Sequence, residues 1–208
     1  MSYIIVGLGN PGSEYEGTRH NAGRIMLDAI RKEFSKDEFG FDKKLNALVA
    51  EAKIEKEKVL LVAPETFMNN SGKSVAPIVK TKAAKAKSGI KGKVADDLLV
   101  IYDDFQLPIG RMKISYNKSS GGHNGLESVI KSIKTEAFPR LRIGTAPATA
   151  KGDAKIPHGD DKIEKFILGK FKDEEIKELK KMSKKAIEGI QAWVKEGRDR
   201  ATNIVNTG

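Results

Sequence analysis

Short apolar runs alternate along the chain with longer segments whose apolar residues recur every three or four positions. The short runs predict β-strands at residues 3–6, 45–53, 58–63, 98–102, 111–116 and 141–144. The periodic segments predict helices at residues 21–34, at residues 126–133 and from about residue 69 or 71 onward. This order is typical of an α/β domain in which helices flank a largely buried, twisted mixed β-sheet in αβα layers.

The most regular helical pattern lies near the C-terminus. Asp173 is placed to cap a helix whose first turn carries Glu174 and Glu175, where carboxylates interact favourably with the helix dipole. Gly197 is expected to end it. The apolar stripe between these limits consists of Ile176, Leu179, Met182, Ala186, Ile187, Ile190 and Trp193. The sequence therefore predicts a long C-terminal helix that packs on the core.

The chain has 208 residues and no cysteine. Because no linker-like segment or internal repeat divides it, we expect one domain over residues 1–208. The lack of cysteine excludes a disulfide framework, a thiolate metal site and a cysteine nucleophile, and is typical of a reducing cytoplasm. No signal-peptide pattern precedes the first glycine, and the longest apolar stretch, residues 59–64, is too short to cross a bilayer. We expect a soluble cytoplasmic protein with no membrane partner.

The net charge of +10 is unevenly distributed. Residues 66–95 contain seven lysines and no acidic residue, and residues 111–142 contain seven basic residues against Glu127 and Glu136. Two basic tracts on a folded domain indicate a polyanionic partner, with RNA or DNA favoured over an anionic membrane. For the first tract alone, a solvated surface loop explains the lysines equally well.

Two of the three histidines stand in short runs rich in glycine and asparagine, at residues 18–23 and 121–125. Histidine exchanges a proton near neutrality, with an ordinary pKa of about 6.5. A base beside carboxamides, with room for a substrate to approach, points to hydrolysis or transfer on a polar substrate. A structural alternative is that His20 caps the helix beginning near Asn21. His158, in a predicted loop, has no comparable setting.

Residues 7–12 follow a predicted strand and match the pattern G-x-G-x-x-G. Dinucleotide binding needs a helix that opens within such a loop, and an acidic residue about twenty residues later at the end of a second strand. Here Pro11 and Gly12 predict a turn, and the expected second strand is missing. The loop instead presents Asn10 at the carboxyl end of a strand, where α/β folds bind ligands.

Asp103 and Asp104 follow the clearest predicted strand, at residues 98–102. Adjacent residues on an extended chain point to opposite sides, so only one of the two carboxylates is expected to face a given site. No His, Asp or Glu residues show the spacing of metal ligands, and no serine-nucleophile motif occurs. We therefore expect neither a metal nor another cofactor.

Several short runs, taken together and in order, closely resemble the bacterial-type peptidyl-tRNA hydrolases. The runs are residues 6–12, Tyr15, 18–23, Pro64, 66–69, 71–72, 102–104, 107–108, 121–126 and 140–144. The resemblance extends from Tyr3 to about Phe171, and is weaker at Trp193 and residues 201–203. It implies a monomeric enzyme of translation that hydrolyses the ester between peptide and tRNA, releasing free tRNA and peptide from chains dropped by the ribosome.

The resemblance also implies the roles of individual residues. His20 resembles the general base that activates water, and Asp103 the carboxylate that orients its imidazole. Asn10, Asn69 and Asn124 resemble the carboxamides that hold the peptide main chain, the terminal nucleotide and the developing oxyanion, with the division among them open. The substrate-binding and tRNA-binding positions implied are Tyr15, Phe67, Met68, Asn69, Asn124, Gly122, Lys113 and Arg142. Met68 is interpreted as a wall of the site, and His123 as structural rather than catalytic.

Three features depart from the family pattern. Residues 80–97 form a longer, more basic insertion, either mobile or adding contacts to RNA, and Gln106 replaces a common acid. Residues 145–159 are rearranged, which could alter the substrate's entry channel. Two alternatives remain: a non-catalytic RNA-binding relative, and an NAD-dependent oxidoreductase that rests on the glycine loop alone.

Overall fold

The computed structural model describes residues 3–85 and 96–207, with the backbone alone for residues 83–85. This part of the chain contains one seven-stranded mixed sheet, in the order β2-β3-β4-β1-β5-β7-β6. The strands are β1 (Tyr3–Gly7), β2 (Gly40–Asp42), β3 (Ala47–Ile54), β4 (Glu57–Pro64), β5 (Leu98–Pro108), β6 (Met112–Tyr116) and β7 (Pro139–Ala146). The central strands β4, β1, β5 and β7 are parallel, and the remaining pairings are antiparallel.

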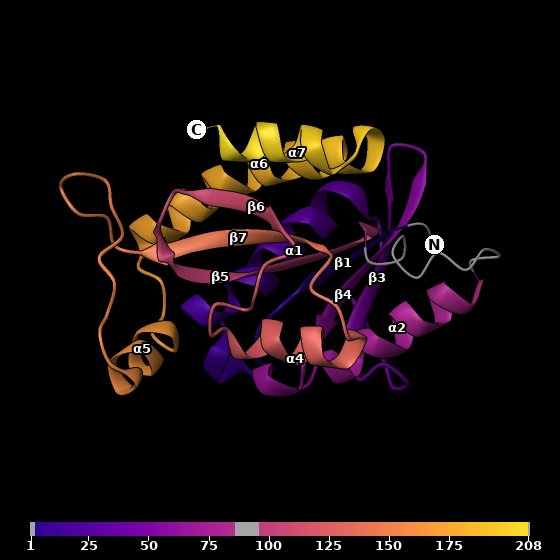
Figure 1. Cartoon of the computed structure of the whole chain (residues 1–208), viewed down its shortest axis with the longest axis horizontal. Helices are drawn as coiled ribbons and strands as arrows, with labels where there is room; N and C mark the ends of the chain where they lie inside the picture. The colour runs from indigo at the N-terminus through magenta and orange to yellow at the C-terminus, as the bar shows by residue number, and fades with distance from the viewer. Residues whose placement is uncertain (1–2, 86–95, 208) are drawn as a thin grey trace.

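Helices cover both faces of the sheet, so the predicted α/β architecture with αβα layers is confirmed (Figure 1). One face packs against α1 (Ala22–Phe34), α6 (Asp173–Glu196) and α7 (Arg198–Asn206). The other packs against α2 (Gly72–Lys85) and α4 (Asn124–Ile133). Helix α5 (Asp160–Ile167) stands apart from both layers and contacts the short helix η2 (Arg19–Asn21).

Alternating residues of the central strands build the two apolar cores. Ile5, Leu99 and Leu141 face α1 and α6, whereas Ile4 and Val100 face α2 and α4. This alternation follows from the two-residue period of a strand and explains why the strands read as continuous apolar runs. The long C-terminal helix is confirmed as α6, whose buried residues include Leu179, Met182, Ala186, Ile190 and Trp193.

The chain leaves neighbouring strands toward opposite faces of the sheet. After β1 it passes into α1 on one face, and after the adjacent β4 it passes into α2 on the other. Such a reversal opens a crevice at the carboxyl ends of parallel strands. Asn10, after β1, and Met68, after β4, therefore lie at the same edge of the sheet, next to Asp103 on β5.

Several predicted boundaries differ from the observed ones by one or two residues, and two further predictions, the end of β5 and the cap of α6, are wrong. The strand expected to stop at Tyr102 continues through Asp103 and Asp104, because both remain paired with β7. Asp173 is not the cap of α6: it occupies the first helical position, and the main-chain N–H of Lys172 donates to Glu175 Oε2 at 2.7 Å.

The sequence analysis also missed β2, α5 and α7. Helix α7 begins directly after Gly197, whose φ of 93° ends α6 and redirects the chain. Residues 80–85 of the predicted basic insertion belong to α2. Most of the rest of that insertion lies outside the described residues, so the expectations about it stay predictions.

Candidate active site

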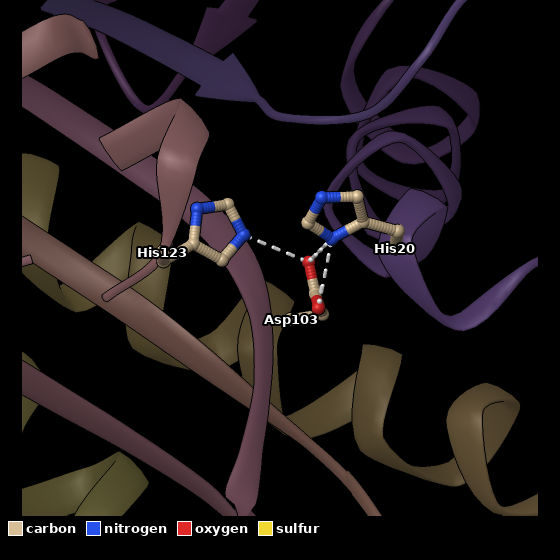
Figure 2. Close-up of side chains that lie close together, drawn as sticks. All are labelled: His20, Asp103 and His123. Atoms are coloured by element: carbon tan, nitrogen blue, oxygen red, sulfur yellow. Dashed lines mark hydrogen bonds and ion pairs between the residues drawn. The ribbon is translucent and has the colours of Figure 1, made fainter. Parts of the chain in front are cut away.

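Asp103 lies between two histidine side chains from distant parts of the chain (Figure 2). Its Oδ1 atom is 2.9 Å from His20 Nδ1 and 2.9 Å from His123 Nε2. Its Oδ2 atom is 3.1 Å from His20 Nδ1. Asp103 and His20 are both buried, with 2% and 6% of their surfaces exposed. The three residues come from β5, from η2 and from the loop before α4, so only folding assembles them.

The hydrogen bonds fix the proton on each ring. The main-chain N–H of Leu126 donates to His123 Nδ1 at 3.1 Å, so His123 Nε2 carries the proton that it donates to Asp103. His20 Nδ1 likewise donates to Asp103, which leaves its Nε2 with a lone pair. Figure 2 shows this second nitrogen of His20 pointing away from Asp103.

The electrostatics agree with this arrangement. Burial acts to raise the pKa of Asp103, but the electrostatic attraction of the His20 and His123 rings and their hydrogen bonds outweigh it and hold that pKa well below its usual range. Burial acts to lower the pKa of His20, yet the charge of Asp103 and its hydrogen bond raise the pKa above the ordinary 6.5. Asp103 is therefore an anion that stabilises the protonated form of His20.

The segment that carries His20 is anchored by its neighbour Arg19. The Arg19 guanidinium donates to both carboxylate oxygens of Glu175, at 2.9 and 3.1 Å, and to the main-chain oxygens of Gly169 and Lys170. It also stacks over the ring of Phe166, 4.6 Å from its centroid. These contacts tie η2 to α5 and α6 and hold the His20 backbone in place.

Asn10 is fixed through its main chain and its side chain. Its main-chain N–H donates to Asn21 Oδ1 at 2.7 Å, and its carbonyl accepts from Asn21 Nδ2 at 3.0 Å. Its own Oδ1 accepts the N–H of Met68 at 2.8 Å, so the Asn10 Nδ2 group remains to serve a ligand. Asn21 was interpreted as the start of a helix, and its role in supporting Asn10 was not predicted.

A cavity of about 720 Å³ opens beside His20. It brings together most of the predicted site residues: Asn10, Tyr15, His20, Phe67, Met68, Asn69, Asp103, Gly122 and Asn124. The rings of Tyr15 and Phe67 meet edge to face, with centroids 6.5 Å apart. Met68 is 5% exposed and packs in the core as well as lining the cavity, which agrees with its interpretation as a wall.

One wall of the cavity comes from residues that the sequence analysis missed. They are Phe105 on β5 and, on and just after α5, Asp160, Ile163, Glu164, Ile167 and Leu168. The rearranged residues 145–159 are not part of the lining. Apolar residues at positions 163 and 167 share one face of a helix, a weak signal in a segment of only eight residues.

Lys113 and Arg142 lie outside this cavity. They are paired across β6 and β7, so their side chains share one face of the sheet. Arg142 lines a smaller adjoining cavity of about 210 Å³, which shares Asp103, Phe105, Gly121 and His123 with the larger one. Asp104 binds Arg142 rather than a histidine, so only Asp103 contacts the histidines, although both carboxylates line the smaller cavity.

His20, Asp103 and His123 also form a group that could hold a metal ion, since their donor atoms lie within 4.8 Å of one another. The chain spacing indicated no such cluster, because the three residues are distant in sequence. Each ring nitrogen that faces Asp103 lies at hydrogen-bond distance and can donate a proton to it. The cluster is therefore satisfied by hydrogen bonds among its own members.

The structure also bears on the glycine-rich loop at residues 7–12. The glycine loop leads into the three-residue helix η1 (Ser13–Tyr15), and α1 begins only at Ala22, so no α-helix opens within the loop. This agrees with the rejection of a dinucleotide fingerprint.

Within the described residues, no helix is both long and apolar enough to span a bilayer.

Comparison with known proteins matches nearly the whole chain. The sequence profile of the family described as peptidyl-tRNA hydrolase matches residues 4–208. A peptidyl-tRNA hydrolase of Desulfitobacterium hafniense is 39% identical over 203 residues, covering 98% of each chain. One from Parasynechococcus marenigrum is 39% identical over 206 residues, covering 98% of this chain and 93% of the relative. A crystal structure of the Acinetobacter baumannii enzyme superposes with a TM-score of 0.84 at 30% identity, covering 100% of this chain and 96% of that one.

Proposed function

Since the chain belongs to the peptidyl-tRNA hydrolase family, whose members hydrolyse the ester bond of peptidyl-tRNA, we propose that His20 is the general base of this reaction. The observation that carries the proposal is the 2.9 Å contact between His20 Nδ1 and Asp103 Oδ1 on the wall of the large cavity. In the neutral ring this contact places the proton on Nδ1 and leaves Nε2 able to take a proton from water.

The reaction then needs no covalent intermediate with the protein. His20 Nε2 removes a proton from a water molecule whose oxygen attacks the ester carbonyl carbon. The bond from that carbon to the ribose oxygen breaks, and the imidazolium returns the proton to the departing oxygen, giving free tRNA and the peptide carboxylic acid, which releases its remaining proton to solvent. Asp103 keeps the ring in the required tautomer and stabilises its cation. General bases of this kind contribute about 10²–10⁴-fold.

The carboxamides are proposed to bind the reacting end of the substrate. Asn10 Nδ2 is available as a donor toward the ester because the Asn10 oxygen is occupied by Met68. Asn69 and Asn124 are exposed residues of the cavity lining and suit the peptide main chain or the terminal nucleotide. Carboxamides can bond the main chain of any peptide regardless of its side chains, which suits a substrate whose sequence varies.

Lys113 and Arg142 are proposed to bind tRNA phosphate. The two cations share one sheet face, and the cavity that Arg142 lines joins the cavity of His20. One bound tRNA end could therefore present its ester to His20 and a phosphate to Arg142. Tyr15, Phe67 and Gly122, also in the lining, are proposed to contact the substrate. We further propose that the enzyme acts as a cytoplasmic monomer without a metal ion.

The test is release of labelled peptide from peptidyl-tRNA by the unmutated protein, by His20→Ala and by Asp103→Asn. Turnover that is lost in His20→Ala, with tRNA binding kept, supports the proposal. Binding without turnover by the unmutated protein would instead indicate a non-catalytic RNA-binding relative. Unchanged turnover after dialysis against a chelator tests metal independence, and sedimentation at assay concentration tests the monomer.

A further inference from the structure

Arg140 on β7 is completely buried, with 0% of its surface exposed. Among the described residues it forms no ion pair, although a buried arginine usually does. Its guanidinium donates instead to main-chain carbonyls and lies over the ring of Phe138, 4.5 Å from the centroid. A buried cation held by backbone oxygens points to a task in fixing the main chain.

Some of these carbonyls precede α4 in the chain and one follows it. Arg140 Nη1 donates to the carbonyls of Lys118 and Ser119 before the helix. Arg140 Nη2 donates to the carbonyl of Glu136 after it, at 2.9 Å. The planar guanidinium therefore links the two ends of the segment from residue 118 to residue 136. A guanidinium suits this bridge because its two terminal nitrogens donate in fixed, different directions, whereas the three N–H groups of an ammonium group radiate from one atom.

This segment carries His123 and Asn124 at the start of α4. From Ser119 the chain passes through Gly121 and Gly122, with φ of 61° and 85°, and the N–H of His123 bonds back to the carbonyl of Ser120 at 3.1 Å. His123 then caps α4 and donates to Asp103. The contacts thus run without a break from Arg140, through the loop and His123, to Asp103.

We propose that Arg140 is a positioning residue of the active site, whose guanidinium holds the loop at residues 118–123 so that His123 stays bonded to Asp103. The proposal rests on the proposed function, in which Asp103 orients the catalytic His20. Arg140 itself touches neither the cavity of His20 nor a substrate. Because Gly122 and Asn124 of the same segment are proposed to contact the substrate, loss of Arg140 should slow the chemical step more than it weakens substrate binding.

The experiment compares Arg140→Lys with Arg31→Lys. Arg31 serves as the control, because it is also buried, at 6% exposed, and also binds a main-chain carbonyl, that of Asp37, but at the far end of α1; unlike Arg140, it also forms ion pairs with Asp28 and Glu38. We expect Arg140→Lys to lower kcat at least tenfold and to change KM by a smaller factor, since displacing a catalytic group by about 1 Å can cost about 10²-fold. Arg31→Lys should keep the kcat of the unmutated protein. Equal losses of kcat in the two variants would overturn the proposal.

A double-mutant cycle with His123→Ala separates positioning from general loosening of the fold. If Arg140 acts through His123, the replacement Arg140→Lys in the His123→Ala background should change kcat less than twofold. Fully additive losses would overturn the proposal. If Arg140→Lys does not fold, Arg140→Gln takes its place, since it removes the buried charge and its shorter side chain does not extend to the positions of the two Nη atoms. Absence of turnover in the unmutated protein would mean that the proposed function has failed, which is distinct from either outcome.

Discussion

Arg142 Nε donates to Asp104 Oδ2 at 2.6 Å, one residue along β5 from the Asp103 carboxylate that contacts His20. Two adjacent residues of β5 thus contact different functional groups. Asp103 binds His20, the proposed base, and Asp104 binds Arg142, which is proposed to bind phosphate. The two sites share one rigid strand, so their separation is set by the sheet.

Replacing Arg142 should weaken tRNA binding and its dependence on salt. Each phosphate contact releases counterions, so Arg142→Ala should flatten the plot of log affinity against log salt concentration by about one unit. Lys113→Ala should do the same. Lys56→Ala, in the exposed turn between β3 and β4, is the matched control and should leave the slope unchanged. An unaltered slope in Arg142→Ala would show that this side chain does not meet phosphate.

Asp103→Asn should leave the fold intact and reduce turnover. An amide at this position can donate to His20 Nδ1 and so favour the tautomer in which Nε2 carries the proton, which removes the acceptor for water. We expect kcat to fall about 10²–10⁴-fold, the range that a general base contributes. Single-turnover hydrolysis of labelled peptidyl-tRNA measures this. A loss of less than about threefold would contradict the role given to Asp103.

Turnover should rise with pH through the pKa of His20. Because the charge of Asp103 raises that pKa above 6.5, the acid limb of kcat/KM should lie above 6.5, and the unprotonated ring is the active form. In Asp103→Asn the raising charge is gone and burial lowers the pKa, so any residual activity should have its limb at lower pH. A limb that stays in place would mean that another group controls the rate.

The same pKa shift predicts how stability depends on pH. A group whose pKa is higher in the folded state stabilises the fold fully below its unfolded value, here 6.5, and this contribution disappears as pH rises through the folded pKa. The difference in unfolding free energy between the unmutated protein and His20→Ala should therefore shrink as pH increases above 6.5. Urea unfolding at a series of pH values measures it, and a difference that grows with pH would contradict the shift.

Gly23→Ala should destabilise the protein. A Cβ atom there would press on the carbonyl of Ile101 and on the main chain of Leu8, far inside van der Waals contact. Overpacking of this kind costs about 1–3 kcal/mol. Gly40→Ala is the control, since a Cβ at Gly40 meets nothing within 4 Å and glycine is unfavourable in a strand. Chemical unfolding of the two variants should separate them, and equal stabilities would contradict the close approach of α1 to β5.

The elements with strong local patterns were predictable from the chain. Burial leaves a recognisable pattern in the sequence: a continuous apolar run in β1, β4 and β5, and a helical apolar stripe in α6. Local patterns failed where tertiary contacts outweigh propensity. β5 continues past Asp103 and Asp104 because their buried carboxylates find His20 and Arg142 as partners. Helices α5 and α7 are short and carry too few apolar positions to show a period.

Residue types and motif order indicated the candidate chemistry, including His20, Asp103 and the three asparagines. Their arrangement was decided by the crossing of the chain between β1, β4 and β5, which brings side chains from distant positions to one edge of the sheet. The same is true of His123, which reaches Asp103 only because its loop folds back over β5. A sequence records which groups are present, whereas hydrogen-bond partners and burial, and with them the pKa of His20, exist only once distant segments meet.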